Sequence, residues 1–271
     1  MINWCGPPLG LALSLVLATA PSGLAAEVQP HRALYSLTLD SAKSGSGVIG
    51  ATGAMYYEWG ETCDGWTIEQ RFRLRLAYAE ADNSDLSSTL VTWEAKNGLR
   101  YRFNERRLKD GEPDEEIHGE AHLDGPGKGG TAEFGRPQSA TITLAPGVIF
   151  PTAHTLYLID RARAGDQFIS RQVFDGSTVD NASQVTAVIG PELKAGDEPN
   201  GKVGQTPVLQ RPSWRIRLAF FSPDGSAELP DYELGLRLYD NGATTDMLLD
   251  YGDYVIRAAL DEIEALPKPA C

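Results

Sequence analysis

The four histidines are the side chains best suited to metal binding or proton transfer, and they are His31, His118, His122 and His154. His118 and His122 are four residues apart, a spacing that on a helix would let both rings reach one metal ion. The surrounding segment 117–123 has strand character, and on a strand this spacing separates the two residues by about 13 Å. The sequence therefore predicts no metal site and no cofactor.

His154 could act as a general base if the fold placed Asp175 or Asp250 beside its ring. A hydrolase would also need a nucleophile, and the chain has no serine in a Gly-x-Ser-x-Gly context. We therefore predict that no residue is catalytic and that His154 has a structural role. A hydrolase or cell-wall enzyme that uses His154 with an aspartate is the alternative.

Two of the three cysteines stand near opposite ends of the chain that would remain after export. Cys5 lies inside an N-terminal apolar segment, which leaves Cys63 and the last residue, Cys271. In an oxidising compartment this arrangement favours a disulfide that closes most of the domain into a loop. In the chain-entropy model such a loop contributes roughly 4–5 kcal/mol to stability. Two unpaired thiols are the alternative.

The N-terminus has the pattern of an export signal. Residues 9–20 are almost wholly apolar, and the small-residue stretch 21–26 follows them. This apolar run is too short to span a bilayer comfortably and ends like a cleavage site, although no Lys or Arg precedes it. We predict a signal peptide over residues 1–26, one domain over 27–271, and a periplasmic protein that does not span a membrane.

The charge of the chain limits its partners. The formal net charge is −13 at neutral pH, and the isoelectric point is near 4.8. The segment 1–26 carries no charged side chain, so the excess lies entirely on the exported part. An acidic surface argues against nucleic acid as a partner and against simple adhesion to anionic lipid.

Alternating apolar and polar residues predict mainly β structure. In segment 66–78, Phe72, Leu74 and Leu76 fall on one face while arginines occupy the other, which is typical of a strand with one buried side. Asn97-Gly98 between two such runs predicts a hairpin. One stretch departs from this pattern, and it predicts an amphipathic helix over 152–164 with Thr152 as its cap and Leu156 and Ile159 on its buried face. A barrel, half-barrel or curved sheet is the expected architecture.

Aromatic residues are the most promising candidates for a binding site. A curved sheet leaves a concave face that one short helix would cover incompletely, so some aromatic side chains are expected to line a groove for an apolar or peptide ligand. The candidate groove residues are Trp59, Trp66, Trp93, Tyr101 and Trp214.

Several short motifs, taken in order, carry a family resemblance. They are His31-Arg32-Ala33-Leu34-Tyr35, Tyr57-Glu58-Trp59, Cys63-Asp64-Gly65-Trp66, the segment 147–154, Val173-Phe174-Asp175-Gly176 and the segment 249–254. With this set the chain resembles the cell-envelope integrity protein EipB family of alphaproteobacterial periplasmic proteins. The resemblance implies a β-spiral, an open and strongly curved antiparallel sheet wrapped partly around a helix. It also implies a disulfide between an early cysteine and the C-terminal one, which matches Cys63 and Cys271.

The functional expectation is a role in binding. The family is tied to maintenance of the cell envelope and to stress resistance, and it has no established molecular activity. We therefore expect a non-enzymatic periplasmic protein that supports envelope integrity by binding an envelope protein, or a lipid-like or peptide ligand. A carrier of lipoproteins or lipids is a second interpretation of the same class.

Overall fold

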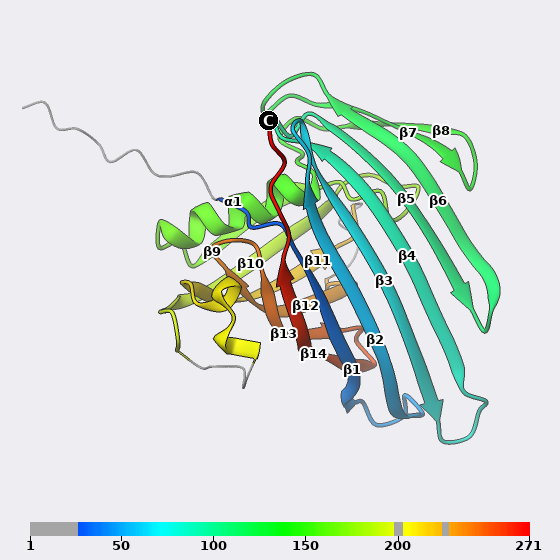
Figure 1. The fold of residues 1–271 in the computed structure, drawn as a ribbon. Coiled ribbons are helices and arrows are strands. Elements are labelled where there is room, and N and C mark those ends of the chain that lie inside the picture. Colours follow the sequence, from blue (N-terminus) through cyan, green and yellow to red (C-terminus); the bar gives the residue numbers. More distant parts are fainter. Residues whose placement is uncertain (1–26, 198–202, 224–227) are drawn as a thin grey trace, which may run out of the picture.

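The computed structural model describes residues 27–197, 203–223 and 228–271 (Figure 1). The predicted signal peptide lies outside the described residues. Within these ranges the chain has fourteen strands and one α-helix, and no helix is long and apolar enough to cross a membrane.

All fourteen strands belong to one sheet, and every neighbouring pair is antiparallel. The strands are β1 (His31–Ala42), β2 (Val48–Glu61), β3 (Gly65–Tyr78), β4 (Ser84–Ala95), β5 (Arg100–Lys109), β6 (Glu112–Leu123), β7 (Gly130–Arg136), β8 (Ala140–Leu144), β9 (Phe168–Val173), β10 (Ser183–Leu193), β11 (Ser213–Phe221), β12 (Tyr232–Tyr239), β13 (Thr244–Asp250) and β14 (Tyr254–Ala265). Their spatial order is β8-β7-β6-β5-β4-β3-β2-β1-β14-β13-β12-β11-β10-β9. The first and last strands of the chain are therefore neighbours inside the sheet, and β8 and β9 form its edges.

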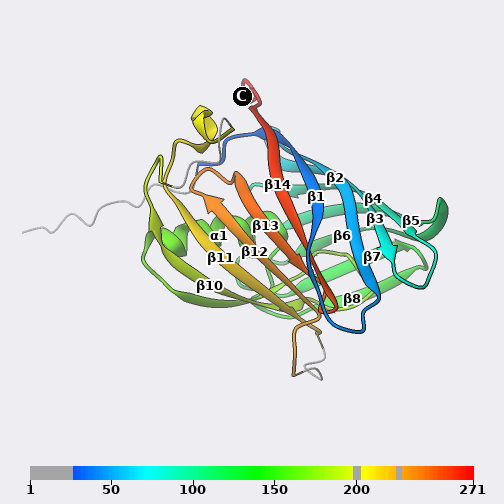
Figure 2. The ribbon, with the colours of Figure 1, turned by 90° about the horizontal axis from the view of Figure 1, so that it is seen from below.

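The helix α1 (Pro151–Arg163) connects the two edge strands and draws them toward each other. Just before α1, the N–H of Ile149 donates to the carbonyl of Gln172 at 3.0 Å, and the N–H of Phe174 donates to the carbonyl of Ile149 at 3.0 Å. This isolated parallel bridge joins the segment between β8 and α1 to the edge strand β9, and β8 and β9 themselves are not paired, so the sheet stays open. Figures 1 and 2 show the sheet curling with α1 inside the curve, which confirms the predicted fold class.

The helix packs on the concave side of β9–β12. Leu158, Ile159 and Ala162 are buried in one core cluster with Trp214 of β11 and Ile169 of β9. Burial of this apolar row holds the helix inside the sheet because each fully buried aliphatic side chain contributes about 1.5–3 kcal/mol.

Two details of the predicted helix are wrong. Leu156 is only half-buried, because the buried row runs through Leu158, Ile159 and Ala162 instead. The residue at the N-cap position is Phe150, whose side chain makes no capping hydrogen bond, so Thr152 is not the cap. A residue from another strand satisfies this helix terminus, as described below.

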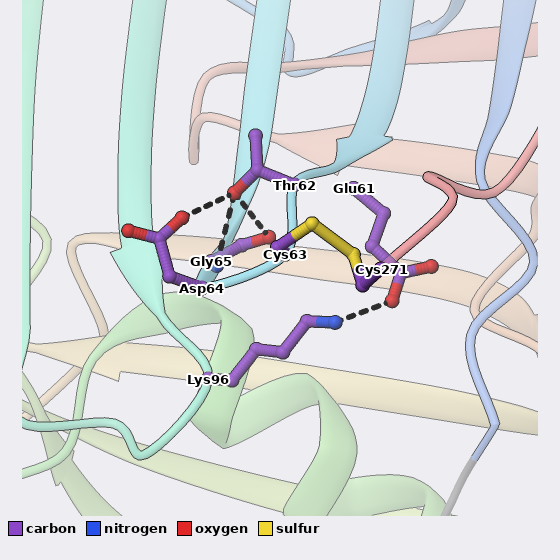
Figure 3. The surroundings of a disulfide bond; sticks show 7 residues. All are labelled: Glu61, Thr62, Cys63, Asp64, Gly65, Lys96 and Cys271. Carbon is purple, nitrogen blue, oxygen red and sulfur yellow. Dashed lines mark hydrogen bonds and ion pairs between the residues drawn. A yellow bond between two sulfur atoms is a disulfide. The ribbon is translucent and has the colours of Figure 1, made fainter.

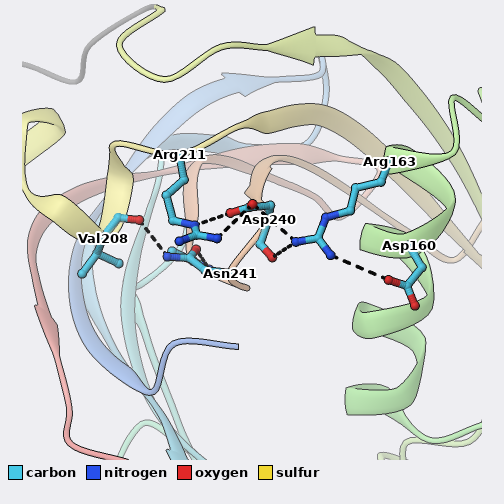
Figure 4. A network of polar contacts seen from close by, with 7 residues as sticks. Asp160, Arg163, Val208, Arg211, Asp240 and Asn241 are labelled. Carbon is cyan, nitrogen blue, oxygen red and sulfur yellow. Dashed lines mark hydrogen bonds and ion pairs between the residues drawn. The ribbon is translucent and has the colours of Figure 1, made fainter. Parts of the chain in front are cut away.

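The opposite end of α1 is tied to the β12–β13 turn (Figure 4). Arg163 donates to the carbonyl oxygen of Asp240 at 3.1 Å, and Arg211 donates to the carboxylate of the same aspartate at 3.1 Å. In that turn the side chain of Asn241 donates to the carbonyl oxygen of Val208 at 2.8 Å. Because Asp240 is buried, its two arginine partners keep its charge from being isolated in the interior.

A disulfide joins Cys63 to Cys271 with their Cα atoms 5.7 Å apart (Figure 3). Cys63 lies in the turn between β2 and β3, and Cys271 ends the tail that follows β14. The tail also pairs with the N-terminal segment, where the N–H of Leu266 donates to the carbonyl of Pro30 at 2.7 Å. The tail that follows β14 is therefore bonded to the turn between β2 and β3. Strand β1 lies between β14 and β2 in the sheet, so the bond links parts of the chain on either side of β1.

We predict that Cys271→Ser lowers the stability of the protein. A disulfide typically contributes 2–4 kcal/mol, which for a domain of this size lowers the melting temperature by roughly 4–16 °C. Thermal unfolding and thiol titration under denaturing, non-reducing conditions measure the change. The double variant Cys63→Ser/Cys271→Ser should have the same melting temperature as Cys271→Ser, because both lose the same bond. Two titratable thiols in the protein without substitutions would contradict the prediction.

Candidate functional site

The concave face contains a main groove of about 580 Å³ between the two halves of the sheet. Alternation along β2 points Met55 and Tyr57 inward, and the facing strands contribute aliphatic side chains that α1 does not cover. The apolar and aromatic lining includes Tyr35, Met55, Phe72, Leu234, Leu236 and Met247. A cavity of this volume falls within the range of about 300–1,000 Å³ that is common for small-molecule sites.

A smaller inner pocket of about 230 Å³ lies at the end of the curve that α1 closes. Trp59 and Tyr101 line it from the sheet, and Thr152 lines it from the first turn of the helix. Tyr57 and Glu105 line both cavities, so the inner pocket adjoins the main groove. An elongated ligand in the main groove would point one end toward α1.

Arg107 is the centre of a polar network on the wall of the main groove. Its guanidinium donates to both carboxylate oxygens of Glu105, at 2.9 and 2.7 Å, and to Glu115 at 2.6 Å. It also donates to the carbonyl oxygen of Ser177 at 3.2 Å. Four of the five N–H groups of the side chain are therefore engaged within the protein.

Glu94 of β4 caps the N-terminus of α1. Its carboxylate accepts the N–H of Thr152 at 2.7 Å and the N–H of Ala153 at 2.8 Å, two of the donors that a helix start leaves unpaired. The side chain is only 2% exposed. Burial raises the pKa of Glu94 to about 7, against the lowering effect of the two backbone N–H groups. A buried acidic side chain from strand β4 thus replaces the local cap that the sequence predicts.

The structure places the five predicted groove residues in different environments. Trp59 and Tyr101 line the inner pocket, and Trp66 packs edge-to-face on Trp59 with ring centroids 6.2 Å apart. Trp214 is buried beneath α1 and belongs to the core. Trp93 lies outside the groove, with the guanidinium of Arg102 5.2 Å from its ring centroid, because its neighbours on β4 face inward.

Sequence reasoning missed a tyrosine cluster at the open end of the main groove. The rings of Tyr232 and Tyr251 line the groove with centroids 5.3 Å apart, and Tyr254 lies 5.3 Å from Tyr251. Tyr251 is 41% exposed. The periodicity of β2 could have identified Tyr57, which is two residues before Trp59. The turn that holds Tyr251 has no such signal. Tyr251 lies beside Tyr232 because β12 pairs with β13 in a register that sets Glu233 opposite Asp250.

The structure does not assemble the histidine–aspartate pair of the alternative interpretation. His154 is 6% exposed, and its Nε2 atom has no hydrogen-bond partner among the described residues. Burial, and secondarily the charge of Arg171, lower the pKa of His154 to about 4. Asp175 accepts the N–H of Ser177 and Asp250 accepts the N–H of Gly252, each at 2.9 Å, so both aspartates stabilise turns.

His118 and His122 both lie on β6, as the strand character of segment 117–123 predicts. In the part of the chain that the structure describes, no group of three His, Cys, Asp or Glu side chains is placed to hold a metal ion.

We predict that Glu94 gives the folded protein a pH-dependent stability. Its folded-state pKa of about 7 lies above the ordinary glutamate pKa of about 4.5, so the folded protein binds this proton more tightly than the unfolded chain. The resulting stabilisation is complete below about pH 4.5 and is lost as the pH rises through 7, about 3 kcal/mol in all. Glu94→Gln, which is neutral throughout, should remove this dependence.

Urea unfolding of the original protein and of Glu94→Gln between pH 4.5 and 8 gives the free energy of unfolding of each. The difference between the two values measures the effect of Glu94, because His154 contributes equally to both proteins. Glu120→Gln is the matched control, since Glu120 is exposed and outside both cavities. A stability difference between the original protein and Glu94→Gln that stays constant over this range would contradict the prediction.

The comparisons with known proteins agree with this architecture. A protein of Brucella abortus (strain 2308) named "Cell envelope integrity protein EipB" is 33% identical over 248 residues, which cover 90% of this chain and 87% of that protein. A solved structure from Brucella abortus, described as a beta-barrel-like protein of domain of unknown function DUF1849, matches with a TM-score of 0.81 and 32% identity over 90% of this chain and all of that one. The model of the EipB-like family matches residues 22–267, and the chain therefore belongs to the EipB-like family.

Proposed function

We propose that this protein supports the integrity of the cell envelope by binding a lipid-like ligand in the main groove, without catalysing a reaction. The main groove itself carries the proposal, because it is a largely apolar cavity of about 580 Å³ that the helix leaves uncovered. The name of the Brucella abortus relative supports the envelope role. The disulfide between Cys63 and Cys271 supports a periplasmic location, since disulfides persist in oxidising compartments.

The lining favours an apolar small molecule over a folded protein domain as the occupant of this groove. Phe72, Leu234 and Leu236 face inward from opposite parts of the sheet and are shielded by its curvature. Such a surface is accessible to a chain or a short segment that enters from the open end. A partner protein that presents or receives the ligand is compatible with the same groove and is part of the proposal.

The groove proposal predicts that Leu236→Trp blocks binding. The larger side chain occupies space in the main groove, so binding of an uncharged apolar dye should weaken by roughly tenfold or more, about 1.4 kcal/mol. Val188→Trp is the matched control, because Val188 is exposed on the outer side of β10. Fluorescence titration measures binding, and melting temperatures check that both variants fold. Equal affinities for Leu236→Trp and Val188→Trp would overturn the proposal.

The same pair of variants tests the envelope role in cells. In a strain that lacks the protein, Val188→Trp should restore growth under detergent stress and Leu236→Trp should not, at equal abundance on a blot. Native mass spectrometry of protein purified from its own periplasm should detect a bound ligand in the control variant alone. If Leu236→Trp restored growth, the envelope role would not depend on ligand binding in the main groove.

The hydrolase alternative predicts a different result for His154→Leu. Leucine fills the buried site and removes the unpartnered Nε2 atom, so we expect stability within about 1 kcal/mol of the original protein and full restoration of growth. Failure of His154→Leu at normal abundance would make the hydrolase interpretation the stronger one.

A further inference from the structure

The charged groups that line the two cavities are mainly acidic. Glu105, Asp114 and Asp175 contribute carboxylates, and Arg107 is the one basic side chain among the described residues of this lining. Arg107 is already bound to Glu105 and to Glu115, so its charge is balanced within the wall. Glu105 is paired with Arg107, and Asp175 lines only the inner pocket. An anionic group that entered the main groove would therefore meet the carboxylate of Asp114 and no available cation.

The arginines of β3 do not change this balance. Arg71, Arg73 and Arg75 alternate with Phe72 and Leu74, so the arginines face the outer side while Phe72 faces the main groove. On the outer side, Arg75 binds Asp85 with both N–H···O distances at 2.8 Å. The strand pattern therefore excludes the positive charge of β3 from the groove.

Aromatic faces occur at the open end of the same cavity. Tyr232 and Tyr251 line the main groove, and Phe220 extends the cluster with its ring centroid 5.5 Å from that of Tyr232. The faces of aromatic rings attract ammonium groups, and this attraction is stronger where water is partly excluded. Carboxylates and aromatic faces in one cavity are complementary to a cation.

We propose that the main groove selects single-chain amphiphiles whose head group is a cationic ammonium. This inference rests on the ligand-binding function proposed above. The apolar chain lies along Met55, Phe72 and Leu234, and the ammonium group lies at the open end near Tyr251 and Asp114. The attraction of the Asp114 carboxylate and that of the Tyr251 ring then both act on the ammonium group.

Three ligands with the same dodecyl chain test the proposal: dodecyltrimethylammonium, dodecyl maltoside and dodecanoate. Each is titrated below its critical micelle concentration against protein that holds an uncharged fluorescent dye, and displacement gives the affinity. We expect the ammonium ligand to bind roughly tenfold more tightly than the maltoside, and the carboxylate ligand to bind most weakly. Dodecanoate that binds as tightly as the ammonium ligand would overturn the proposal.

Substitutions in the main groove test whether the groove itself produces the preference for the ammonium head group. Asp114→Asn and Tyr251→Leu should each weaken binding of the ammonium ligand by roughly three- to tenfold and leave the maltoside affinity unchanged, whereas Tyr251→Phe should keep the preference because it retains the ring. Asp114 is exposed, so its variant is not expected to affect folding. Glu120→Gln on the outer side makes the same change in net charge. An equal loss in Glu120→Gln and Asp114→Asn would overturn the proposal, since the preference would then come from overall charge.

Failure of this inference differs from failure of the proposed function. If all three ligands displace the dye from the original protein with equal affinity, and Leu236→Trp binds the dye weakly, the groove binds apolar chains whatever the head group and only the preference is wrong. If none of the three ligands displaces the dye, both the groove function and the preference are wrong.

Discussion

Burial of α1 against the concave side of β9–β12 is the interaction on which the rest of the structure depends. The helix connects the two edge strands of the sheet, so its position sets how far the sheet curls. Leu158 and Ile159 provide the apolar contact, while Glu94 and Asp240 hold the two ends of the helix. The apolar contact has no direction of its own, so the two polar anchors determine where along the sheet the helix lies.

This position of the helix also creates the groove. Because α1 covers only one side of the concave face, Met55, Phe72 and Met247 line the main groove with no residue of the helix beside them. Curvature of the sheet then brings them opposite Leu234 and Leu236 of β12, and a cavity remains between the two walls. The inner pocket adjoins the first turn of α1, so the element that stabilises the fold also closes one end of the site.

Charge is distributed by the same strand alternation that distributes hydrophobic residues. The arginines of β3 face outward, where Arg71 pairs with Glu69 and Arg75 pairs with Asp85. The groove contains Glu105 and Asp114. An overall charge of −13 is therefore accompanied by an acidic groove. Both properties disfavour anionic ligands, since desolvating a charge near like charges is costly.

The sequence by itself determined the properties that depend on local pattern: strands with one buried face, a helix near 152–164, and a charge that argues against nucleic acid. The resemblance carried by its short motifs supplied the spiral form of the sheet. Residues distant in sequence decided the rest. Glu94 replaced Thr152 as the cap of α1 because strand β4 passes beside the helix terminus. Trp93 faces outward, Trp214 is covered by α1, and Tyr251 lies beside Tyr232 in the main groove. Pleat direction, helix coverage and the pairing of β12 with β13 are set only when the whole sheet has formed.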